Sequence, residues 1–186
     1  IYDEAQRLDV PLTIHGGVSQ NLGLDRVASF LEAHMLEHPV GLFLHITNMM
    51  FQGVFQEFPK LRVAYLEAGA GWVPYWLQRM EQHWEFSGNA EHPELKKPPT
   101  EYFLSNFLVA ARGDERTLPA AISLVGDRSF AVNTDYPHPD GTWPWGIDRL
   151  VANEAIPRAS RQRILWDNAA DVFGLEATGD PAAASS

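Results

Sequence analysis

Three residues able to bind a metal ion or move a proton follow short apolar runs that are typical of strands. His15 follows the run LTI, Glu67 follows LRVAYL, and Asp135 follows FAVNT, and a glycine or proline comes within two residues of each. Parallel strands that end in such residues present them at one edge of the sheet, where α/β enzymes place their chemistry. An imidazole with carboxylates suits Zn²⁺ or Mn²⁺, and a metal held there lowers the pKa of a bound water or polarises a carbonyl.

Residues 132–146, VNTDYPHPDGTWPWG, contain the densest group of such side chains. Asp135, His138 and Asp140 lie within six residues, and Trp143 follows in the same stretch rich in proline and glycine. This pattern predicts a reactive carboxylate at a strand end, with His138 and Trp143 near it. The alternative is an Asx turn that ends the strand, followed by ordinary loop residues.

Two more histidines, His34 and His38, are four residues apart in a predicted helix. This spacing can bind metal. Glu37 shares their face and the helix is expected to be an outer one, so we interpret the face as solvated. An apolar stripe that includes Leu31 and Met35 is expected to be the buried one.

Length and composition limit the classes of protein to consider. The chain has 186 residues, 45% of them hydrophobic and 20% charged, which predicts one globular domain or a large part of one. A net charge of -10 argues against nucleic-acid and anionic-membrane partners. The chain has no cysteine, so disulfides and thiolate metal sites are excluded. No run of about 18 apolar residues and no signal peptide occur, so no membrane span and a cytoplasmic location are expected.

Apolar periodicity predicts that strands and helices alternate along the chain, which is typical of a parallel sheet. Asp114 is predicted to cap the helix that follows it, Gly174 to end the last helix, and residues 176–186 to form a disordered tail. Four such units are half of a (β/α)8 TIM barrel, which typically takes about 250 residues. A four-stranded doubly wound domain is the alternative. The predicted strands are 12–14, 61–66, 103–110 and 128–135, and the predicted helices are 1–8, 24–37, 40–58, 72–86, 115–124, 146–155 and 160–173.

The chain resembles the amidohydrolase-related family that includes aminocarboxymuconate-semialdehyde decarboxylase and the resorcylate-type decarboxylases. The similar stretches are LDVPLTIHGG, FQEFPKLRVAYLEAGAGWVPYWLQRME, NTDYPHPDG and WDNAADVFGL. The resemblance implies an α/β fold, the (β/α)8 TIM barrel, with residues 1–175 as its C-terminal units, strands five to eight. It also implies a divalent metal, usually zinc, at the C-terminal face, with His15 and Asp135 among its ligands.

The sequence departs from the family pattern in two places. The family's His-x-His ligand pair on the first strand has no counterpart here, so the chain is expected to be the C-terminal half of the barrel. Several members have a histidine at the end of strand six, where this chain has Glu67. For this reason we favour metal-dependent hydrolysis as the reaction, with non-oxidative decarboxylation, a carboxy-lyase reaction, as the alternative.

The expected roles follow from these matches. Asp135 is predicted to bind the metal and to handle a proton, and Glu67 to act as a base or an orienting group. His138 and Trp143 are predicted to contact a small carboxylated or cyclic organic substrate. A reading from a different class is a catalytically incomplete half-barrel that acts only by association. Unpaired strand edges and a large apolar face favour dimerisation, so a homodimer is expected.

Overall fold

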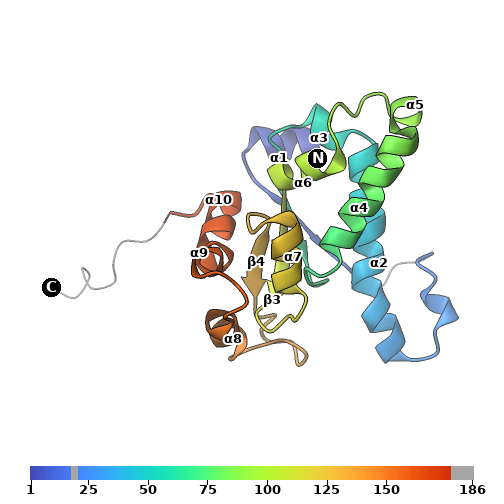
Figure 1. The fold of residues 1–186 in the computed structure, drawn as a ribbon. Helices are drawn as coiled ribbons and strands as arrows, with labels where there is room; N and C mark the ends of the chain where they lie inside the picture. The colour runs from blue at the N-terminus through green and yellow to red at the C-terminus, as the bar shows by residue number, and fades with distance from the viewer. Residues whose placement is uncertain (18–20, 177–186) are drawn as a thin grey trace.

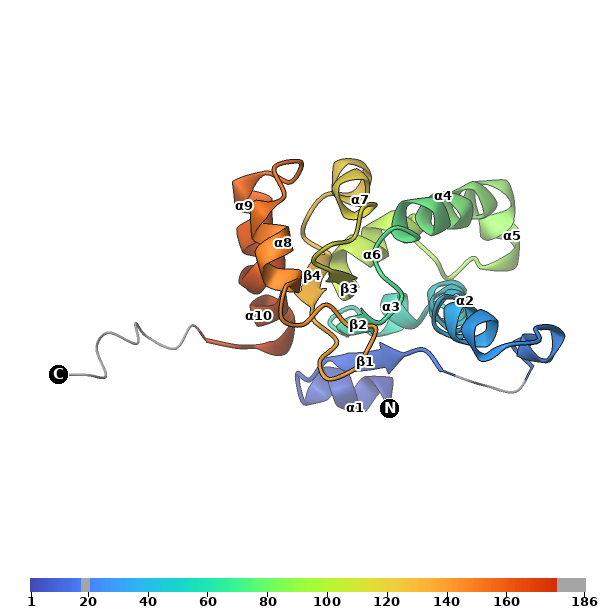
Figure 2. The ribbon, with the colours of Figure 1, turned by 90° about the horizontal axis from the view of Figure 1, so that it is seen from below.

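Four parallel strands form one sheet in a computed structural model that describes residues 1–17 and 21–176 (Figures 1 and 2). Pairing is parallel throughout: Leu12 lies opposite Val63, Val63 opposite Phe107, and Val109 opposite Phe130. The predicted parallel sheet is confirmed, and its strands lie in sequence order. The strands are β1 (Leu12–His15), β2 (Val63–Leu66), β3 (Phe107–Arg112) and β4 (Phe130–Asn133).

Helical segments connect the strands and follow the last one. Within the described residues, no helix combines the length and the apolar character needed to cross a membrane. Gly174 ends the last helix with φ 65°, as predicted. The predicted disordered tail, apart from Glu176, lies outside the described residues. The segments are α1 (Tyr2–Arg7), η1 (Leu24–Arg26), α2 (Phe30–Phe51), α3 (Val54–Glu57), α4 (Val73–His83), η2 (Trp84–Gly88), α5 (Asn89–Glu91), α6 (Pro99–Asn106), α7 (Leu118–Val125), α8 (Gly146–Ala152), α9 (Arg158–Gln162), η3 (Arg163–Asp167) and α10 (Asn168–Phe173).

The strands bury side chains on both faces, because successive strand residues point to opposite sides of a sheet. On one face Tyr65, Val109 and Phe130 join a large core that includes residues of α2, α4, α6 and α7. On the other face three smaller residues, Ala64, Leu108 and Ala131, pack against Ala169 and Val172 of α10. Burial on both faces explains why β2 and β3 are continuous apolar runs.

Helix α2 corrects the prediction of two helices that meet near residue 39. Ser29 caps the helix in a capping box: its Oγ accepts a hydrogen bond from the Glu32 N–H at 3.3 Å, and the Glu32 carboxylate accepts one from the Ser29 N–H at 2.8 Å. The helix runs through Pro39, although a proline removes one backbone hydrogen bond. Leu42 and Ile46 beyond it are buried, and their packing stabilises the continuous helix.

Two other boundaries also differ from the prediction. Residues 103–106, expected to begin the third strand, belong to α6, because Pro98-Pro99 starts a helix there and Asn106 Nδ2 donates to the Leu61 carbonyl at 2.7 Å. The next helix, expected from residue 115, begins at Leu118. Asp114 does not cap it, because its carboxylate pairs with Arg112 and Arg149.

Candidate active site and metal centre

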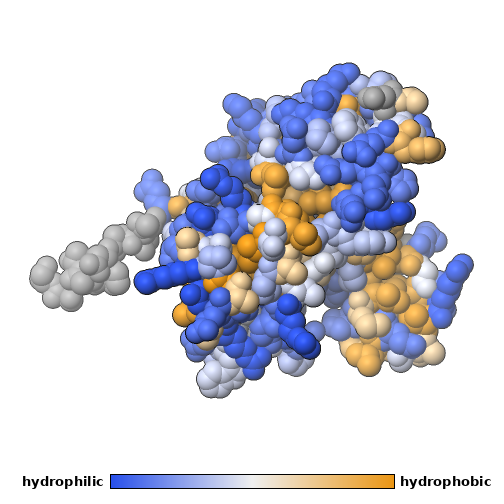
Figure 3. Space-filling view, in the orientation of Figure 1, coloured by the Kyte–Doolittle hydropathy of each residue, from blue (hydrophilic) through white to orange (hydrophobic). Residues whose placement is uncertain are grey.

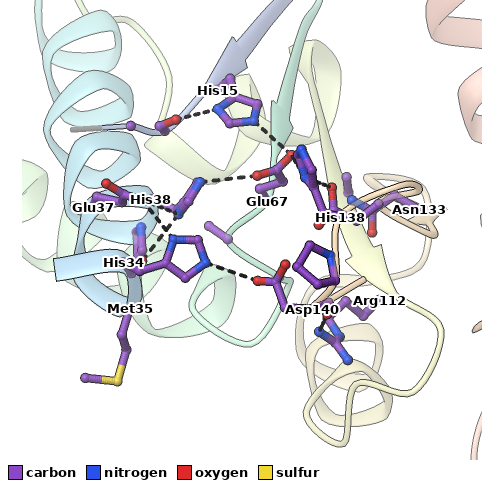
Figure 4. Close-up of a pocket in the computed structure, with 18 of the residues that line it drawn as sticks. His15, His34, Met35, Glu37, His38, Glu67, Arg112, Asn133, His138 and Asp140 are labelled. Atoms are coloured by element: carbon purple, nitrogen blue, oxygen red, sulfur yellow. Dashed lines mark hydrogen bonds and ion pairs between the residues drawn. The ribbon is translucent and has the colours of Figure 1, made fainter. Parts of the chain in front are cut away.

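A cavity of about 930 Å³ lies beyond the carboxyl ends of the strands, between them and α2 (Figure 4). Each strand contributes a polar residue to it at or just after its last position: His15, Glu67, Arg112 and Asp135. The predicted convergence of His15, Glu67 and Asp135 at one edge of the sheet is therefore what the fold produces. The remaining polar lining comes from α2 and from the loop after β4.

Glu67 stands at the centre of the cavity's polar groups (Figure 4). Its Oε1 atom is 2.8 Å from His15 Nε2, and its Oε2 atom is 3.2 Å from His38 Nε2. The other ring nitrogen of His15, Nδ1, contacts the Gly16 carbonyl. His15, His38 and Glu67 each place one potential ligand atom within 4.8 Å of the other two. The arrangement offers two imidazoles and a carboxylate to one small cation.

Asp135 also lies close to the Glu67 carboxylate. Its Oδ1 atom is 2.9 Å from His138 Nδ1, and His138 Nδ1 is 4.0 Å from Glu67 Oε1. Glu67, Asp135 and His138 form a second group with potential ligand atoms within 4.8 Å of one another. His15 and Asp135 thus each meet Glu67. The His138 side chain is 58% exposed, which places it at the open side of the cavity.

The backbone at two of these positions adopts a conformation that ordinary residues rarely take. Glu67 has φ 62° and Asp135 has φ 56°, both in the left-handed region. For a residue with a Cβ this conformation costs about 1–2 kcal/mol. Left-handed non-glycine residues are concentrated at functional sites, where surrounding structure holds them in place. At both positions the unusual turn comes directly after a strand and directs a carboxylate into the cavity.

The loop after Glu67 is held by a carboxylate from the neighbouring unit. Glu115 accepts hydrogen bonds from the backbone N–H groups of Ala70 at 2.9 Å and Gly71 at 2.7 Å. Thr117 Oγ1 donates to the same carboxylate at 2.7 Å. These bonds satisfy backbone donors in the turn that precedes α4. Glu115 therefore fixes the turn that positions Glu67.

The face of α2 with its two histidines lines the cavity, which corrects our interpretation of it as solvated. His34 Nδ1 is 2.9 Å from Glu37 Oε1, and His34 Nε2 is 3.1 Å from Asp140 Oδ2 in the loop after β4. Leu31 and Met35, which were predicted to be buried, line the same cavity and are largely accessible. Figure 3 shows apolar residues gathered over this lower part of α2.

Sequence reasoning also missed Arg112, the last residue of β3. The strand had been expected to end near residue 110, which left its polar end unrecognised. Arg112 Nη1 donates to the Asp140 carbonyl at 2.6 Å, and its Nε atom lies 3.2 Å from Asp114 Oδ1. The guanidinium is the cation that β3 contributes to the lining. The signal available in the sequence was the pattern shared with the other strands, an apolar run followed by a polar residue and glycine.

Electrostatic effects in the cavity follow from these contacts. The hydrogen bond to the Gly16 carbonyl and the contact with Glu67 raise the pKa of His15, although partial burial works in the opposite direction. Burial works to raise the pKa of Glu67, but hydrogen bonds with His15 and Asp135 and the charge of His38 outweigh it, so this pKa is lowered. The Asp140 and Glu37 carboxylates raise the pKa of His34. The cavity is therefore a region of negative potential that favours bound cations.

Trp143 is the one predicted site residue that the fold keeps out of the cavity lining. Its side chain is 60% exposed and packs edge to face against Tyr136, with ring centroids 5.4 Å apart. The other predicted residues, His15, Glu67, Asp135 and His138, all line the cavity.

Two curated proteins are similar to this chain along nearly its whole length. The 2-amino-3-carboxymuconate-6-semialdehyde decarboxylase of Dictyostelium discoideum is 26% identical over 178 residues, which cover 95% of this chain and 48% of that protein. The gamma-resorcylate decarboxylase of Polaromonas sp. (strain JS666) is 27% identical over 185 residues, which cover 94% and 53%. The chain spans about half the length of these curated relatives.

Solved structures share the fold. An amidohydrolase from Mycobacterium avium subsp. paratuberculosis K-10 matches 94% of this chain and 44% of its own with a TM-score of 0.79 and 20% identity. A dihydroxybenzoic acid decarboxylase from Polaromonas sp. JS666, with bound manganese and the inhibitor 2-nitroresorcinol, matches 95% and 53% with a TM-score of 0.70 and 24% identity. The α/β units described above are therefore part of a (β/α)8 barrel, as the sequence predicted.

A family model connects the sequence with these relatives. The model, described as amidohydrolase, matches residues 1–175, which include all four strands and the helical segments through α10. The resemblance noted in the sequence is thereby confirmed, and the chain belongs to the amidohydrolase family.

Proposed function

We propose that the protein containing this chain is a metal-dependent carboxy-lyase that removes CO₂ from a small aromatic acid. The observation that carries the proposal is the meeting of His15, Glu67 and Asp135 side chains at the strand ends of an amidohydrolase-family barrel. The activity is proposed for the whole protein, because the chain spans about half the length of its relatives.

The reaction type is chosen from the relatives. Both curated proteins are decarboxylases, and the matched structure with bound manganese is also that of a decarboxylase. These likenesses favour the carboxy-lyase alternative over the hydrolysis that the sequence suggested. Hydrolysis was favoured because Glu67 replaces the family's histidine. It remains the second candidate function, supported by that one residue.

The donor set fits a divalent cation. His15 and Asp135 would hold it, and Glu67 lies between them with an imidazole or carboxylate neighbour on each side. Imidazole and carboxylate donors without thiolates suit Mn²⁺ as well as Zn²⁺. When bound, such a cation supplies a Lewis acid that polarises the oxygen atoms of a ligand.

The chain's own residues bind the acid and manage the proton. Arg112 presents a guanidinium to the cavity, where it can pair with a substrate carboxylate or phenolate. In decarboxylation the bond between ring carbon and carboxylate breaks, CO₂ leaves, and the ring carbon takes up a proton. His138, held by Asp135 at 2.9 Å on the open side of the cavity, is the proposed proton donor. Glu67 orients His15 and His38 through its two oxygen atoms.

The test uses the protein at its full natural length, loaded with Mn²⁺ or Zn²⁺. We expect CO₂ release from hydroxybenzoates such as 2,6-dihydroxybenzoate, the compound bound in one matched decarboxylase structure. Asp135→Ala should lower kcat/KM by more than about 100-fold, because loss of groups that merely orient a metal ligand already costs 10- to 100-fold. The matched control is Asp148→Ala, an exposed carboxylate on α8 outside the cavity lining.

Three results would overturn the proposal. Hydrolysis of a lactone or amide panel without CO₂ release would favour the second candidate. Bound metal and activity that survive Asp135→Ala would remove Asp135 from the site. A folded homodimer with neither activity would favour the reading of a protein that acts by association; light scattering during the same purification measures the oligomeric state.

A further inference from the structure

The helix face opposite the strand ends carries a potential ligand set of its own. His34, Glu37 and His38 lie at positions i, i+3 and i+4 of α2, and each places one ligand atom within 4.8 Å of the other two. Two histidines four residues apart on one helical face are a spacing that zinc sites use. All three residues line the cavity, so an ion could reach them from solution.

The distances from Glu37 to the two histidines lie on either side of the distance between ligands in a tetrahedral zinc site. Ligand atoms about 2.0–2.1 Å from zinc are about 3.3 Å from one another in such a site. Glu37 Oε1 lies 2.9 Å from His34 Nδ1 and 3.8 Å from His38 Nδ1, on either side of that value. Metal binding would require the three side chains to rotate until their ligand atoms reach the metal distance.

The far sides of both imidazole rings meet carboxylates that set their tautomers. His34 Nε2 is 3.1 Å from Asp140 Oδ2, and His38 Nε2 is 3.2 Å from Glu67 Oε2. A neutral imidazole that donates from Nε2 to a carboxylate keeps a lone pair on Nδ1. Metal-binding histidines almost always donate their other ring N–H in this way. His34 Nδ1 and Glu37 Oε1, 2.9 Å apart, share a hydrogen in the metal-free protein, and a bound cation would take the place of that hydrogen.

A competing contact of His38 is weaker. His38 Nδ1 also lies 3.4 Å from the His34 carbonyl, at the long limit of a hydrogen bond. Donation from Nδ1 to that carbonyl in a neutral ring would turn the lone pair of Nε2 toward the Glu67 carboxylate, which is repulsive. The carboxylate contact at Nε2 therefore determines which nitrogen carries the hydrogen.

Glu37 adds a second, independent indication. The residue is only 7% exposed although it is a carboxylate, and burying an ionised carboxylate is costly unless a cation or hydrogen bonds compensate it. Within the described part of the chain, its interactions are with His34 and His38, and Asp140, at the other ring nitrogen of His34, adds further negative charge. A divalent cation would balance these charges better than one imidazolium.

We propose that α2 carries a second divalent-cation site, in which His34 Nδ1, Glu37 Oε1 and His38 Nδ1 bind Zn²⁺ or a similar ion. Asp140 and Glu67 accept the Nε2 hydrogens and orient the rings. Three protein ligands leave a further position open to the cavity, which suits a water molecule or a carboxylate of a bound ligand. Its ligands differ from His15 and Asp135, although His38 also lies within reach of His15 and Glu67. The site does not depend on which reaction the protein catalyses.

The experiment measures bound zinc per chain in the full-length protein after equilibration with Zn²⁺ and gel filtration. The wild type is expected to hold one ion more than the His34→Ala/His38→Ala double variant. The Asp135→Ala variant is expected to lose a different ion, so the two losses should add in the combined variant. His83→Ala is the matched control, because this exposed histidine of α4 lies outside the cavity lining.

A second measurement keeps the result independent of folding defects in the double variant. Co²⁺ replaces zinc and reports its ligands through visible absorption bands. Glu37→Gln keeps the side chain's shape and should remove the bands of the α2 ion while leaving circular dichroism unchanged. Equal zinc content in wild type and double variant, or Co²⁺ bands unaltered by Glu37→Gln, would overturn the proposal.

Discussion

The two sides of the cavity are built from different kinds of element. The strand-end wall, formed by His15, Glu67 and Asp135, comes from residues at or just after the ends of strands. The helix wall, formed by His34, Glu37 and His38, comes from one side of a 22-residue helix. Both walls hold imidazoles and carboxylates at contact distance, yet only the first was recognised in the sequence.

The difference reflects how each element fixes its side chains. In a parallel sheet the carboxyl ends of all strands lie at the same edge, so the order of the strands already determines which residues meet. A helix can turn any of its faces toward its neighbours, and the outcome depends on packing along its whole length. In α2 the buried residues Leu42, Ile46 and Met49 lie beyond Pro39 and set the rotation that brings His34 to the cavity. Function on a helix is therefore harder to recognise than function at a strand end.

Removal of the group that connects the walls should have the largest effect. Glu67 contacts His15 with one oxygen and His38 with the other. If the proposed carboxy-lyase function holds, Glu67→Ala should lower kcat/KM by at least about 100-fold, because it frees imidazoles on both walls. The control is Glu57→Ala, an exposed carboxylate on α3 outside the cavity lining. Full activity in Glu67→Ala would mean that the walls act separately.

A methyl group placed between the walls should force them apart. The Cβ atom of an alanine at residue 16 would lie 2.4 Å from His38 Cα and 2.9 Å from the His38 carbonyl oxygen. Backbone atoms cannot rotate away, so Gly16→Ala should lower the free energy of unfolding by about 1–3 kcal/mol. Gly17→Ala is the matched control, because a Cβ there has no neighbour within 4 Å. Urea denaturation measures both, and equal midpoints would contradict the close approach of β1 and α2.

The smallest effect should be the pH dependence of stability contributed by two histidines of α2, whose pKa values shift in opposite directions. Asp140 and Glu37 raise the pKa of His34, whereas burial lowers the pKa of His45. The contribution of His34 to stability is fully present below about pH 6.5 and is lost as pH rises through its folded pKa. The contribution of neutral His45 is present above about pH 6.5 and is lost as pH falls from there toward its folded pKa.

NMR titration of the histidine side chains in metal-free protein measures both values. His34 should titrate above the ordinary histidine value and His45 below it. Asp140→Asn should move the pKa of His34 downward and leave that of His45 unchanged, since His45 contacts Tyr65 instead. A pKa of His34 that stays the same in Asp140→Asn would show that the loop after β4 does not reach the helix wall.

Much of the fold and half of the site could be predicted from the sequence, for physical reasons. The apolar run LRVAYL and its counterparts marked the strands, and Gly174 marked the end of α10. The start of α7 could not be predicted. Glu115 was expected to begin this helix, but its carboxylate instead accepts a hydrogen bond from the N–H of Ala70, which is 45 residues away in the sequence. The exposure of Leu31 and Met35 was equally hidden, since an apolar stripe gives no sign that it faces an open cavity.

The left-handed backbone at Glu67 and Asp135 affects how this protein would respond to laboratory evolution. Glycine adopts that conformation without cost, so replacing either carboxylate with glycine removes a local penalty of about 1–2 kcal/mol. A library screened only for resistance to heat should therefore enrich glycine at these two positions. The same clones would lose the groups around which the cavity is arranged. Selection for thermal stability would then favour glycine at these two positions, whereas selection for turnover would favour the carboxylates.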